Sequence, residues 1–586
     1  MIICGIKLTH DGGIALIDNG ELKFSIEIEK LANNSRYSAI NDLSVIPEIL
    51  EANGYALCQV DRFVVDGWFA TGEADGPARL KLLNAGEEVE VEVALYNEKL
   101  KGDNVLERYT FGGSLPIGSD RYPYSSYMHV AGHIASAYCT SPMAAARQSS
   151  YILTWDGGQC PRLYYFDHET KRITNIGQLF LFLGSIYSIF AQYFGPYKLT
   201  EAELEASSPD NDAEGFAGGL SVAGKVMSYI ALGKVRPELF PLFDQVRKDQ
   251  TSVSNQYGHQ FSAQVRKLLD ADLYSDEDCL ATMHGYLEKL LIEKLRDKIS
   301  RSPFNCKNLC IAGGCALNIK WNSAIRSSGL FDRVYVPPFP NDSGSAIGAA
   351  CNEYLSQTHG RFVAWNVYSG PAIKKTMADE DWSREECSIR QLALHLYETG
   401  EPVVFLNGAA ELGPRALGNR SILSTPVDPR TKDLLNYVKK RESYRPVAPI
   451  CLEAMAPQLF EPGSKDPFML FDHKVRGEWT ERIPAVCHLD GTARLQTVNE
   501  KDNKEIFDLL TEFYRLSGIP CLCNTSANLN GSGFFPDVAS AAAWGQLNYI
   551  WCDNSLYTKK VKRDLSAFKS LQKVVIAGAG DQEEIE

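Results

Sequence analysis

Paired cysteines, long apolar runs and an excess of positive charge are all missing from this sequence of 586 residues. Its fifteen cysteines form no C-x-x-C pair, and Cys521 and Cys523 have no second thiol pair nearby. We therefore expect neither a secreted disulfide framework nor a zinc–thiolate site. The net charge of −14 also disfavours a general nucleic-acid binder, because an anionic surface repels phosphate backbones.

The sequence also lacks a segment that would be expected to cross a membrane. The uncharged stretch 173–197 is interrupted by amide, glycine and serine residues, and its apolar run is shorter than the ~20 residues that a span needs. The first residues lack the basic region and long apolar run of a signal peptide. We expect a cytoplasmic protein with no membrane partner, in which residues 173–197 form core or line an apolar pocket.

The length is about four times that of a typical domain, which favours two or more large domains. With 45% hydrophobic and 23% charged residues the composition is that of a globular protein. An irregular polar segment near residues 358–387 indicates a domain boundary. We predict one domain over residues 1–360, a linker over 361–386 and a second α/β domain over 387–586.

Two stretches of the first domain share the same order of elements. A predicted strand over 2–8 leads into Asp11-Gly12-Gly13 and a hairpin, and a strand over 151–155 leads into Asp156-Gly157-Gly158 and another hairpin. Each turn taken alone is equally well explained as ordinary Asp-Gly turn chemistry. Together they indicate an internal duplication of one α/β unit, with glycines that let backbone N–H groups approach phosphate.

A third glycine turn, Gly313-Gly314, follows a predicted strand over 308–312 and precedes a helix predicted to begin near Ala316. A strand that leads into a helix in this way presents N–H groups to phosphate. The G-x-G-x-x-G spacing and the Walker lysine are both absent, so neither a Rossmann fold nor a P-loop is predicted.

His129 and His133 lie four residues apart, a spacing that places both imidazoles on one face of a helix, as a divalent metal requires. Val130 replaces the glutamate of the H-E-x-x-H motif, which excludes a zinc-protease site. Asp156 and Asp342, each at a strand end beside glycine, could complete a shell for iron, manganese or zinc. Two ordinary core or surface histidines remain the alternative.

Positive charge is concentrated in one part of the second domain. Residues 411–450 hold eight basic side chains against four acidic ones. Arg415 and Arg420 lie together in a glycine-bounded turn, and their forked guanidinium groups suit bidentate contact with phosphate or carbamate-like anions. A solvated basic face is the alternative.

Four segments, 413–423, 438–449, 488–498 and 523–526, carry a resemblance that extends over nearly the whole chain. The sequence resembles the NodU/CmcH-type O-carbamoyltransferase family. The resemblance implies an α/β protein with a duplicated, actin-like ATPase (ASKHA) domain at the N-terminus and a YrdC-like α/β domain at the C-terminus.

The resemblance also implies a two-step activity. The YrdC-like domain would form carbamoyladenylate from carbamoyl phosphate and ATP, with Mg²⁺ expected beside the ATP, and release pyrophosphate. The N-terminal domain would then transfer the carbamoyl group to an acceptor hydroxyl. Iron, or another divalent metal, is the metal that the resemblance implies for this domain.

Site residues follow from the resemblance by motif. The implied metal ligands are His129, His133, Asp156 and Asp342. The residues implied in catalysis are His10, which we expect to remove the acceptor proton, and Lys439 and Arg494 in the second domain. Residues implied to bind nucleotide or carbamoyl phosphate are Gly313, Gly314 and Asn318, the weaker candidates Gly224 and Lys225, and Arg415, Arg420, Arg441, Asn524 and Ser526.

The acceptor is expected to be a small-molecule alcohol of natural-product type. If the aromatic run 180–194 lines the acceptor pocket, a macrolide or ansamycin is favoured. A homodimer remains open. The alternatives are a tRNA-modifying carbamoyltransferase, which the net charge disfavours, and an actin-like nucleotide-dependent switch or scaffold, which would need neither the basic cluster nor the histidine pair.

Overall fold

The N-terminal part of the chain begins with a five-stranded mixed sheet. The computed structural model describes residues 1–69, 77–99, 102–206, 213–248, 252–270, 272–529 and 531–565. In spatial order, the strands are β3 (Glu21–Glu27), β2 (Gly13–Asp18), β1 (Ile2–Lys7), β4 (Arg62–Asp66) and β9 (Tyr124–Tyr127). Strands β1, β2 and β3 form an antiparallel meander, whereas β1, β4 and β9 run parallel.

A second sheet repeats this topology. In spatial order, its strands are β12 (Ile173–Gln178), β11 (Arg162–Phe166), β10 (Ser150–Thr154), β13 (Asn308–Ala312) and β14 (Arg333–Tyr335). The first three strands again form an antiparallel meander, and β10, β13 and β14 run parallel. The repeat that the two Asp-Gly-Gly turns predict is therefore present as two sheets with the same strand order and sense.

Two helices pack between the two sheets and contact each other. Helix α2 (His129–Cys139) packs on β10 and β13, while α11 (Ser345–Gln357) packs on β1, β2 and β4, and the two helices contact each other. A Cβ atom on Gly348 would lie 2.0 Å from the carbonyl oxygen of Gly132, so this close crossing requires glycine. Every residue of α2 is buried, which fixes the first turn of the helix in place.

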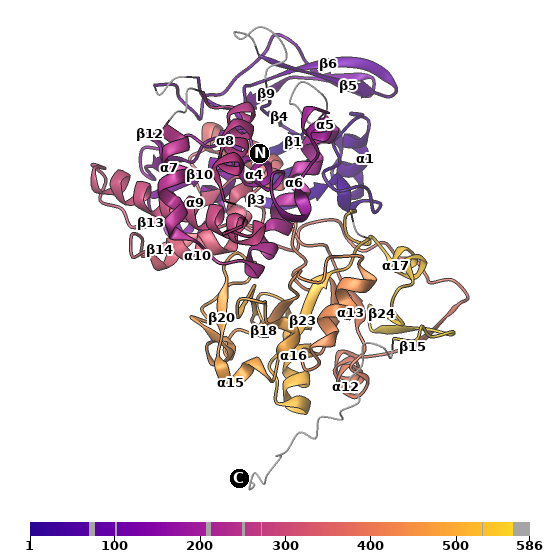
Figure 1. Cartoon of the computed structure of the whole chain (residues 1–586). Helices are drawn as coiled ribbons and strands as arrows, with labels where there is room; N and C mark the ends of the chain where they lie inside the picture. The colour runs from indigo at the N-terminus through magenta and orange to yellow at the C-terminus, as the bar shows by residue number, and fades with distance from the viewer. Residues whose placement is uncertain are drawn as a thin grey trace.

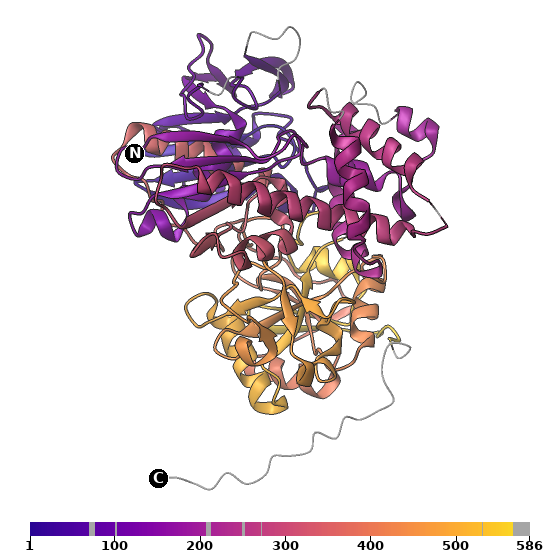
Figure 2. The same cartoon turned by 60° about the vertical axis from the view of Figure 1, so that its left-hand side comes forward.

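A helical lobe is attached to the second sheet (Figure 2). Its main helices are α4 (Ile186–Ala191), α6 (Ala213–Tyr229), α7 (Phe240–Lys248), α8 (Asn255–Leu268) and α9 (Asp276–Ser300). The uncharged stretch 173–197 contributes Phe182, Phe190 and Phe194 to the core of this lobe. Among the described residues, no helix has the length and hydropathy needed to cross a bilayer.

The C-terminal part forms an eight-stranded sheet that lies below the N-terminal part in Figures 1 and 2. In spatial order, its strands are β15 (Trp382–Glu386), β25 (Ser555–Lys559), β24 (Tyr549–Cys552), β16 (Val403–Leu406), β17 (Arg420–Ser424), β23 (Cys521–Ser526), β18 (Ala448–Leu452) and β22 (Gln496–Val498). Its principal helices are α12 (Ile389–Thr399), α13 (Arg430–Val438), α16 (Lys504–Ser517) and α17 (Val538–Trp544).

The predicted linker 361–386 is only partly irregular. Strand β15 lies inside it and pairs antiparallel with β25 at the edge of the C-terminal sheet. The segment Trp382–Glu386 is charged and mostly exposed, so it has no apolar run that would predict a strand. An edge strand does not require such a run. The last residues of the predicted second domain, 566–586, lie outside the described residues.

Direct polar contacts join the two parts. The Lys30 ammonium donates to the carbonyl oxygens of Glu411 and Gly413, both at 2.7 Å, and to a Glu27 carboxylate oxygen at 2.6 Å. A Cβ atom on Gly413 would lie 2.1 Å from the Pro338 carbonyl oxygen. Because these contacts are buried and closely fitted, the turn that begins at Gly413 is held directly against the N-terminal part.

Candidate functional site

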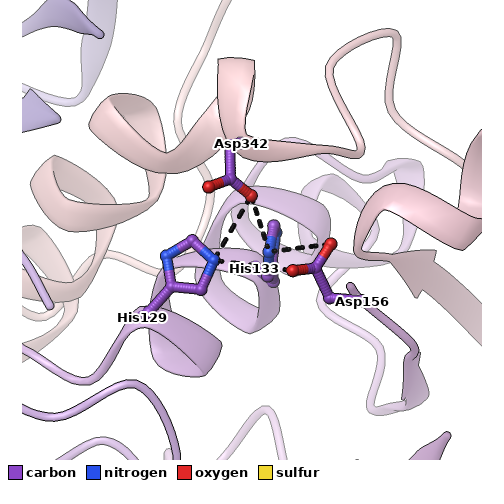
Figure 3. Close-up of side chains that lie close together, drawn as sticks. All are labelled: His129, His133, Asp156 and Asp342. Carbon is purple, nitrogen blue, oxygen red and sulfur yellow. Dashed lines mark ion pairs between the residues drawn. The ribbon is translucent and has the colours of Figure 1, made fainter. Parts of the chain in front are cut away.

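Four side chains converge where strands of the two N-terminal sheets end (Figure 3). His129 opens α2 directly after β9, and His133 lies one turn further on the same face. Asp156 follows β10, and Asp342 lies in the loop between β14 and α11. One ligand atom from each residue lies within 4.8 Å of the others, and all four residues are buried. The structure therefore brings together the four predicted metal ligands, which we call the candidate metal centre.

The donor atoms of this centre fit a divalent cation. Nε2 of His129 lies 3.3 Å from Oδ1 of Asp342, and Nε2 of His133 lies 3.5 Å from the same oxygen and 3.8 Å from Oδ1 of Asp156. Among the described residues, neither Nε2 atom has a hydrogen-bond partner. Two buried imidazole nitrogens beside two carboxylates form a mixed nitrogen and oxygen set that suits iron, manganese or zinc.

Two further buried residues orient His129. Oδ2 of Asp66 lies 2.7 Å from Nδ1 of His129 and accepts a hydrogen bond from the Lys7 ammonium at 3.0 Å. Lys7 also forms an ion pair with Asp342 at 2.9 Å. Because Nδ1 of His129 is held by the Asp66 carboxylate, Nε2 is directed towards the other ligands. Such a carboxylate–imidazole pair is the usual support of a metal-bound histidine.

The electrostatics of the centre are strongly coupled. Burial opposes the charged form of His129, but the carboxylate of Asp342 raises the pKa of this imidazole well above its ordinary value. Burial likewise opposes ionisation of Asp342, but the charges of His129 and Lys7 hold its pKa well below the usual range. Burial and Asp342 oppose ionisation of Asp156, while the imidazoles of His129 and His133, whose Nε2 atoms lie 3.9 and 3.8 Å from its carboxylate oxygens, hold its pKa low. Both carboxylates are thus ionised and available to a cation.

The predicted phosphate turn at Gly313-Gly314 is part of this centre. The N–H of Gly314 donates to Oδ1 of Asp156 at 2.5 Å, and the Tyr96 hydroxyl donates to its Oδ2. Gly313 has a φ of +89° and approaches Trp155 so closely that a Cβ atom would lie 2.4 Å from the Trp155 carbonyl oxygen. The glycines here allow the turn to hold a metal-ligand carboxylate.

Asn318 caps the helix α10 (Ile319–Ser327), where its side chain accepts hydrogen bonds from the N–H groups of Lys320 and Trp321, both at 3.2 Å. Its oxygen therefore serves the helix. The sequence predicted a helix beginning near Ala316, but a short 3-10 turn over Gly314–Leu317 comes first.

His10 borders the centre. Its Nδ1 lies 3.1 Å from Oδ2 of Asp11, and its Nε2 lies 3.4 Å from Oδ2 of Asp342. The ring also packs edge-on against Trp68, with centroids 5.1 Å apart. His10 is half-buried, unlike the four buried residues of the centre.

The second group of predicted site residues lies in the C-terminal part. Lys439 is 2% exposed, and its ammonium donates to the Ser526 hydroxyl at 3.2 Å, to Oδ1 of Asn528 at 2.5 Å and to the Ser526 carbonyl oxygen. The Arg441 guanidinium donates to the hydroxyls of Thr525 at 3.0 Å and Ser526 at 3.2 Å. These contacts bring Lys439, Arg441 and Ser526 together, as predicted.

Further arginines surround them, and we call the whole set the cationic cluster. Its members are Arg36, Arg415, Lys439, Arg441, Arg445 and Arg494. Burial, Arg445 and other neighbours lower the pKa of Arg441 to about 9, and burial with Arg445 and Arg441 lowers the pKa of Arg494 to about 10. Among the described residues, Nε of Arg415 and Nε of Arg494 have no hydrogen-bond partner. The cluster concentrates positive charge, and few carboxylates or hydrogen-bond acceptors lie beside it. Such an arrangement suits a polyanionic ligand.

Two predicted anion-binding residues make structural contacts. The Arg420 guanidinium is 1% exposed, and its hydrogen bonds within the described residues go to the backbone carbonyl oxygens of Pro371, Asn407, Gly408 and Asn419. The Asn524 side chain donates to Gln496 at 2.9 Å and to the Ala416 carbonyl oxygen at 3.1 Å, while its own Oδ1 has no hydrogen-bond partner among the described residues. Arg420 therefore stabilises the loop beside β17, and its role in the anion site stays a prediction.

The predicted Gly224-Lys225 site lies on helix α6 and does not form a phosphate turn. A Cβ atom on Gly224 would meet nothing within 4 Å. The Lys225 ammonium forms an ion pair with Glu442 at 3.0 Å and so links the helical lobe to the C-terminal part. The resemblance implied Gly224 and Lys225 as weaker nucleotide-binding candidates, and in the structure both lie within helix α6.

Several residues that lie in the two clusters are not among the predicted site residues. Lys7 and Asp66 end β1 and β4, and the carboxyl ends of neighbouring parallel strands are a signal that could have placed them beside each other. Tyr96 and Arg36 carried no such signal, because each reaches its cluster only through tertiary packing. Arg445 was counted within the basic stretch but was not assigned to the site.

These features define a two-domain α/β protein with a candidate metal centre in one part and a candidate anion site in the other. The family model described as Carbamoyltransferase N-terminus matches residues 2–351, and Carbamoyltransferase C-terminus matches residues 395–559. The chain belongs to the carbamoyltransferase family and is an enzyme of that class. The family resemblance that the motifs predict is thereby confirmed.

Known relatives match over nearly their whole length. Nodulation protein U of Rhizobium tropici is 46% identical over 585 residues, which cover 97% of each chain. Nodulation protein U of Bradyrhizobium diazoefficiens is 43% identical over 588 residues. The 3'-hydroxymethylcephem-O-carbamoyltransferase of Streptomyces clavuligerus is 30% identical over 575 residues, covering 95% of this chain and 99% of that one.

Proposed function

We propose that the protein transfers a carbamoyl group from carbamoyl phosphate to a hydroxyl of a small natural product. Family membership implies carbamoyl phosphate as the donor. The Streptomyces clavuligerus relative is named for O-carbamoylation of a hydroxymethyl cephem, and it aligns over nearly the whole chain. The acceptor is therefore an alcohol, and the reaction is a tailoring step.

The two clusters support a division of this reaction into two steps. In the first, the cationic cluster binds carbamoyl phosphate and ATP, whose mutual repulsion it offsets. Water cleaves carbamoyl phosphate to carbamate and phosphate, and a carbamate oxygen then attacks the α-phosphorus of ATP, so that carbamoyladenylate forms and pyrophosphate leaves. This step assigns a YrdC-like role to the C-terminal domain and Mg²⁺ to the ATP. The second step, transfer, belongs to the N-terminal domain, whose duplicated sheets support an actin-like ancestry. The single observation that carries the proposal is that one chain holds both a buried centre of histidines and aspartates and a partly buried cationic cluster.

The candidate metal centre would act in transfer. His129, His133, Asp156 and Asp342 would hold a divalent metal, for which iron is our first candidate, and the bound metal would supply a Lewis acid for the carbamoyl oxygen. His10 would act as general base. Its Nδ1 lies 3.1 Å from the Asp11 carboxylate, which would orient the ring, and its Nε2 lies 3.4 Å from Oδ2 of Asp342, so a proton accepted at Nε2 would be taken beside the centre.

The aromatic run that favoured a macrolide or ansamycin lies in a hydrophobic core, so its burial gives no support of its own to this acceptor class. Phe180, Phe182, Phe190 and Phe194 are all buried in the core of the helical lobe. The test of the acceptor therefore compares three kinds of alcohol: a macrolide or ansamycin, a hydroxymethyl cephem and a polar aminosugar. We further propose a cytoplasmic enzyme without a nucleic-acid partner, since the net charge of −14 disfavours the tRNA-modifying alternative.

The test is to incubate the purified protein with ATP and carbamoyl phosphate, with and without each acceptor. We expect AMP and pyrophosphate from the first incubation and a carbamoylated acceptor, detected by mass, from the second. Formation of ADP and phosphate without AMP would contradict the adenylate step and favour the nucleotide-dependent switch. Carbamoylation of tRNA, with no reaction of any small alcohol, would contradict the acceptor class.

A further inference from the structure

A loop of the N-terminal domain is docked on the C-terminal domain beside the cationic cluster. The backbone N–H of Arg36 donates to the Gly531 carbonyl oxygen at 2.9 Å, and the N–H of Gly533 donates to the Asn34 carbonyl oxygen at 2.9 Å. A Cβ atom on Gly533 would lie 1.9 Å from the Glu29 carbonyl oxygen, so the two backbones are in direct contact. The loop over residues 28–37 is thus fixed to the segment 531–533.

The same segment positions Lys439. Nδ2 of Asn528 donates to the Ser532 carbonyl oxygen at 2.6 Å, while Oδ1 of Asn528 accepts from the Lys439 ammonium at 2.5 Å. The Ser532 hydroxyl donates in turn to Oδ1 of Asn33 at 3.0 Å. A continuous chain of hydrogen bonds therefore connects the N-terminal loop to the most buried cation of the cluster.

Burial opposes the charged form of the Arg36 guanidinium, but Glu29, Tyr37 and Asp11 raise its pKa above the ordinary value, so Arg36 stays charged. It is half-buried, Glu29 lies 3.8 Å from its Nε, and among the described residues that Nε has no hydrogen-bond partner. Burial lowers the pKa of Lys439 well below its ordinary value, and the nearby charges of Arg441 and Arg36 lower it further. Burial, Arg494 and Arg36 likewise lower the pKa of Arg415 well below its ordinary value. The charge of Arg36 therefore reaches three other members of the cluster, Arg441 included.

We infer that Arg36 of the N-terminal domain binds the phosphate groups of the nucleotide, so that the anion site is built from both domains. This inference rests on the proposed use of ATP. A guanidinium that stays charged beside other cations, with an Nε that has no hydrogen-bond partner among the described residues, can donate hydrogen bonds to a polyanion. The adenylate would thus form against a residue of the domain that consumes it. Arg36 is a binding residue in this assignment, because it touches the substrate.

The experiment compares full-length wild-type protein with Arg36→Ala, Arg36→Lys and the control Arg301→Ala. Arg301 is exposed and pairs only with Asp297 of its own helix, so its loss removes the same charge from a remote surface. Calorimetric titrations with ATP, inorganic pyrophosphate and carbamoyl phosphate give the affinities. We expect Arg36→Ala to weaken binding of ATP and pyrophosphate about tenfold, the value of one charge-assisted hydrogen bond, with partial recovery in Arg36→Lys. The control should match wild type.

The outcomes separate this inference from the proposed function. If wild type binds neither ATP nor pyrophosphate, both are overturned. If wild type binds ATP and Arg36→Ala binds it equally well, only this inference is overturned, and loss of carbamoyl phosphate binding alone would also overturn the nucleotide assignment. The docking hydrogen bond uses the backbone N–H, so the melting temperature of Arg36→Ala should stay unchanged. Should it fall, Arg36→Gln keeps the length of the side chain without its charge and must show the same tenfold loss.

Discussion

The two buried clusters of this protein differ in how their charges are balanced. In the candidate metal centre, the carboxylates of Asp66, Asp156 and Asp342 face the Lys7 ammonium and two imidazoles within ion-pair distance. Buried charges are tolerated when opposite charges and hydrogen bonds surround them. This centre is therefore compensated before any ligand arrives.

The cationic cluster lacks such compensation. Among the described residues, its ion pairs are limited to Glu29 beside Arg36 at 3.8 Å, and Glu442 beside Arg445 at 3.7 Å. Its neighbours repel one another, and burial weakens the hydration that would offset this repulsion. The difference teaches that charges are balanced within the centre itself, whereas the arginines and lysine of the cluster have few carboxylates beside them.

The largest expected effect comes from removing the most buried cation of the cluster. Lys439→Met should lower AMP and pyrophosphate formation at least about 100-fold, since it removes a fixed charge from the site where phosphate charge develops. Transfer from separately supplied carbamoyladenylate should persist. The control is Lys440→Asn, because Lys440 is exposed with a φ of +50°, a conformation that asparagine tolerates. An equal loss in the control would contradict a specific role for Lys439.

Removing a ligand of the metal centre should give the opposite pattern. His133→Ala should lower bound metal, measured by elemental analysis, and carbamoyl transfer by about 100-fold, but leave AMP formation near wild type. His359→Ala changes an exposed histidine and should leave both activities intact. If His133→Ala stopped AMP formation equally, the assignment of separate sites would be wrong.

A smaller effect on metal affinity is expected from Asp66, which contacts the metal-ligand candidate His129. Asp66→Asn keeps the size of the side chain but removes the charge that orients His129, and should weaken metal affinity about 10-fold to 100-fold. Competition with a chelator measures this change. Asp297→Asn, on the exposed face of α9, serves as the control. Unchanged affinity in Asp66→Asn would mean that the helix alone orients the imidazole.

The lack of compensation in the cluster predicts a gain in stability when function is lost. Arg415→Gln should raise the melting temperature of the ligand-free protein by about 2 °C, because one buried, mutually repelled charge is removed. Pyrophosphate should stabilise wild type more than this variant. Arg430→Gln, which alters an exposed arginine on α13, should not raise the melting temperature. A clear fall in Arg415→Gln would show that the cluster is compensated after all.

The smallest effect is expected at the link between the helical lobe and the C-terminal part. Lys225→Ala breaks a partly exposed ion pair with Glu442, and such pairs contribute about 0–1 kcal/mol. ATP affinity should change by less than about threefold in the same titration. A loss of tenfold or more would restore the nucleotide-binding role that the sequence suggested for Lys225.

Local patterns predicted the metal centre better than the anion site. The spacing of His129 and His133 follows from the pitch of a helix, and Asp156 and Asp342 each belong to a short turn motif at a strand end. Arg415 and Arg420 lie in one motif, yet the structure directs only Arg415 to the cluster. Nothing in the motif specifies which guanidinium faces the carbonyl oxygens of its own loop, because packing of distant segments decides it.

The sequence by itself determined the duplicated strand–turn–strand order, the helical histidine pair, the basic stretch of the C-terminal domain and the family. These features depend on contacts between residues close along the chain, so residue type and spacing are enough to reveal them. Only the tertiary structure decided which carboxylate supports His129, which arginines share a site, and that the loop carrying Arg36 docks on the segment 531–533, some 500 residues away. The physical reason is that charge compensation depends on distance in space and on exclusion of water, and both arise only when the domains are packed together.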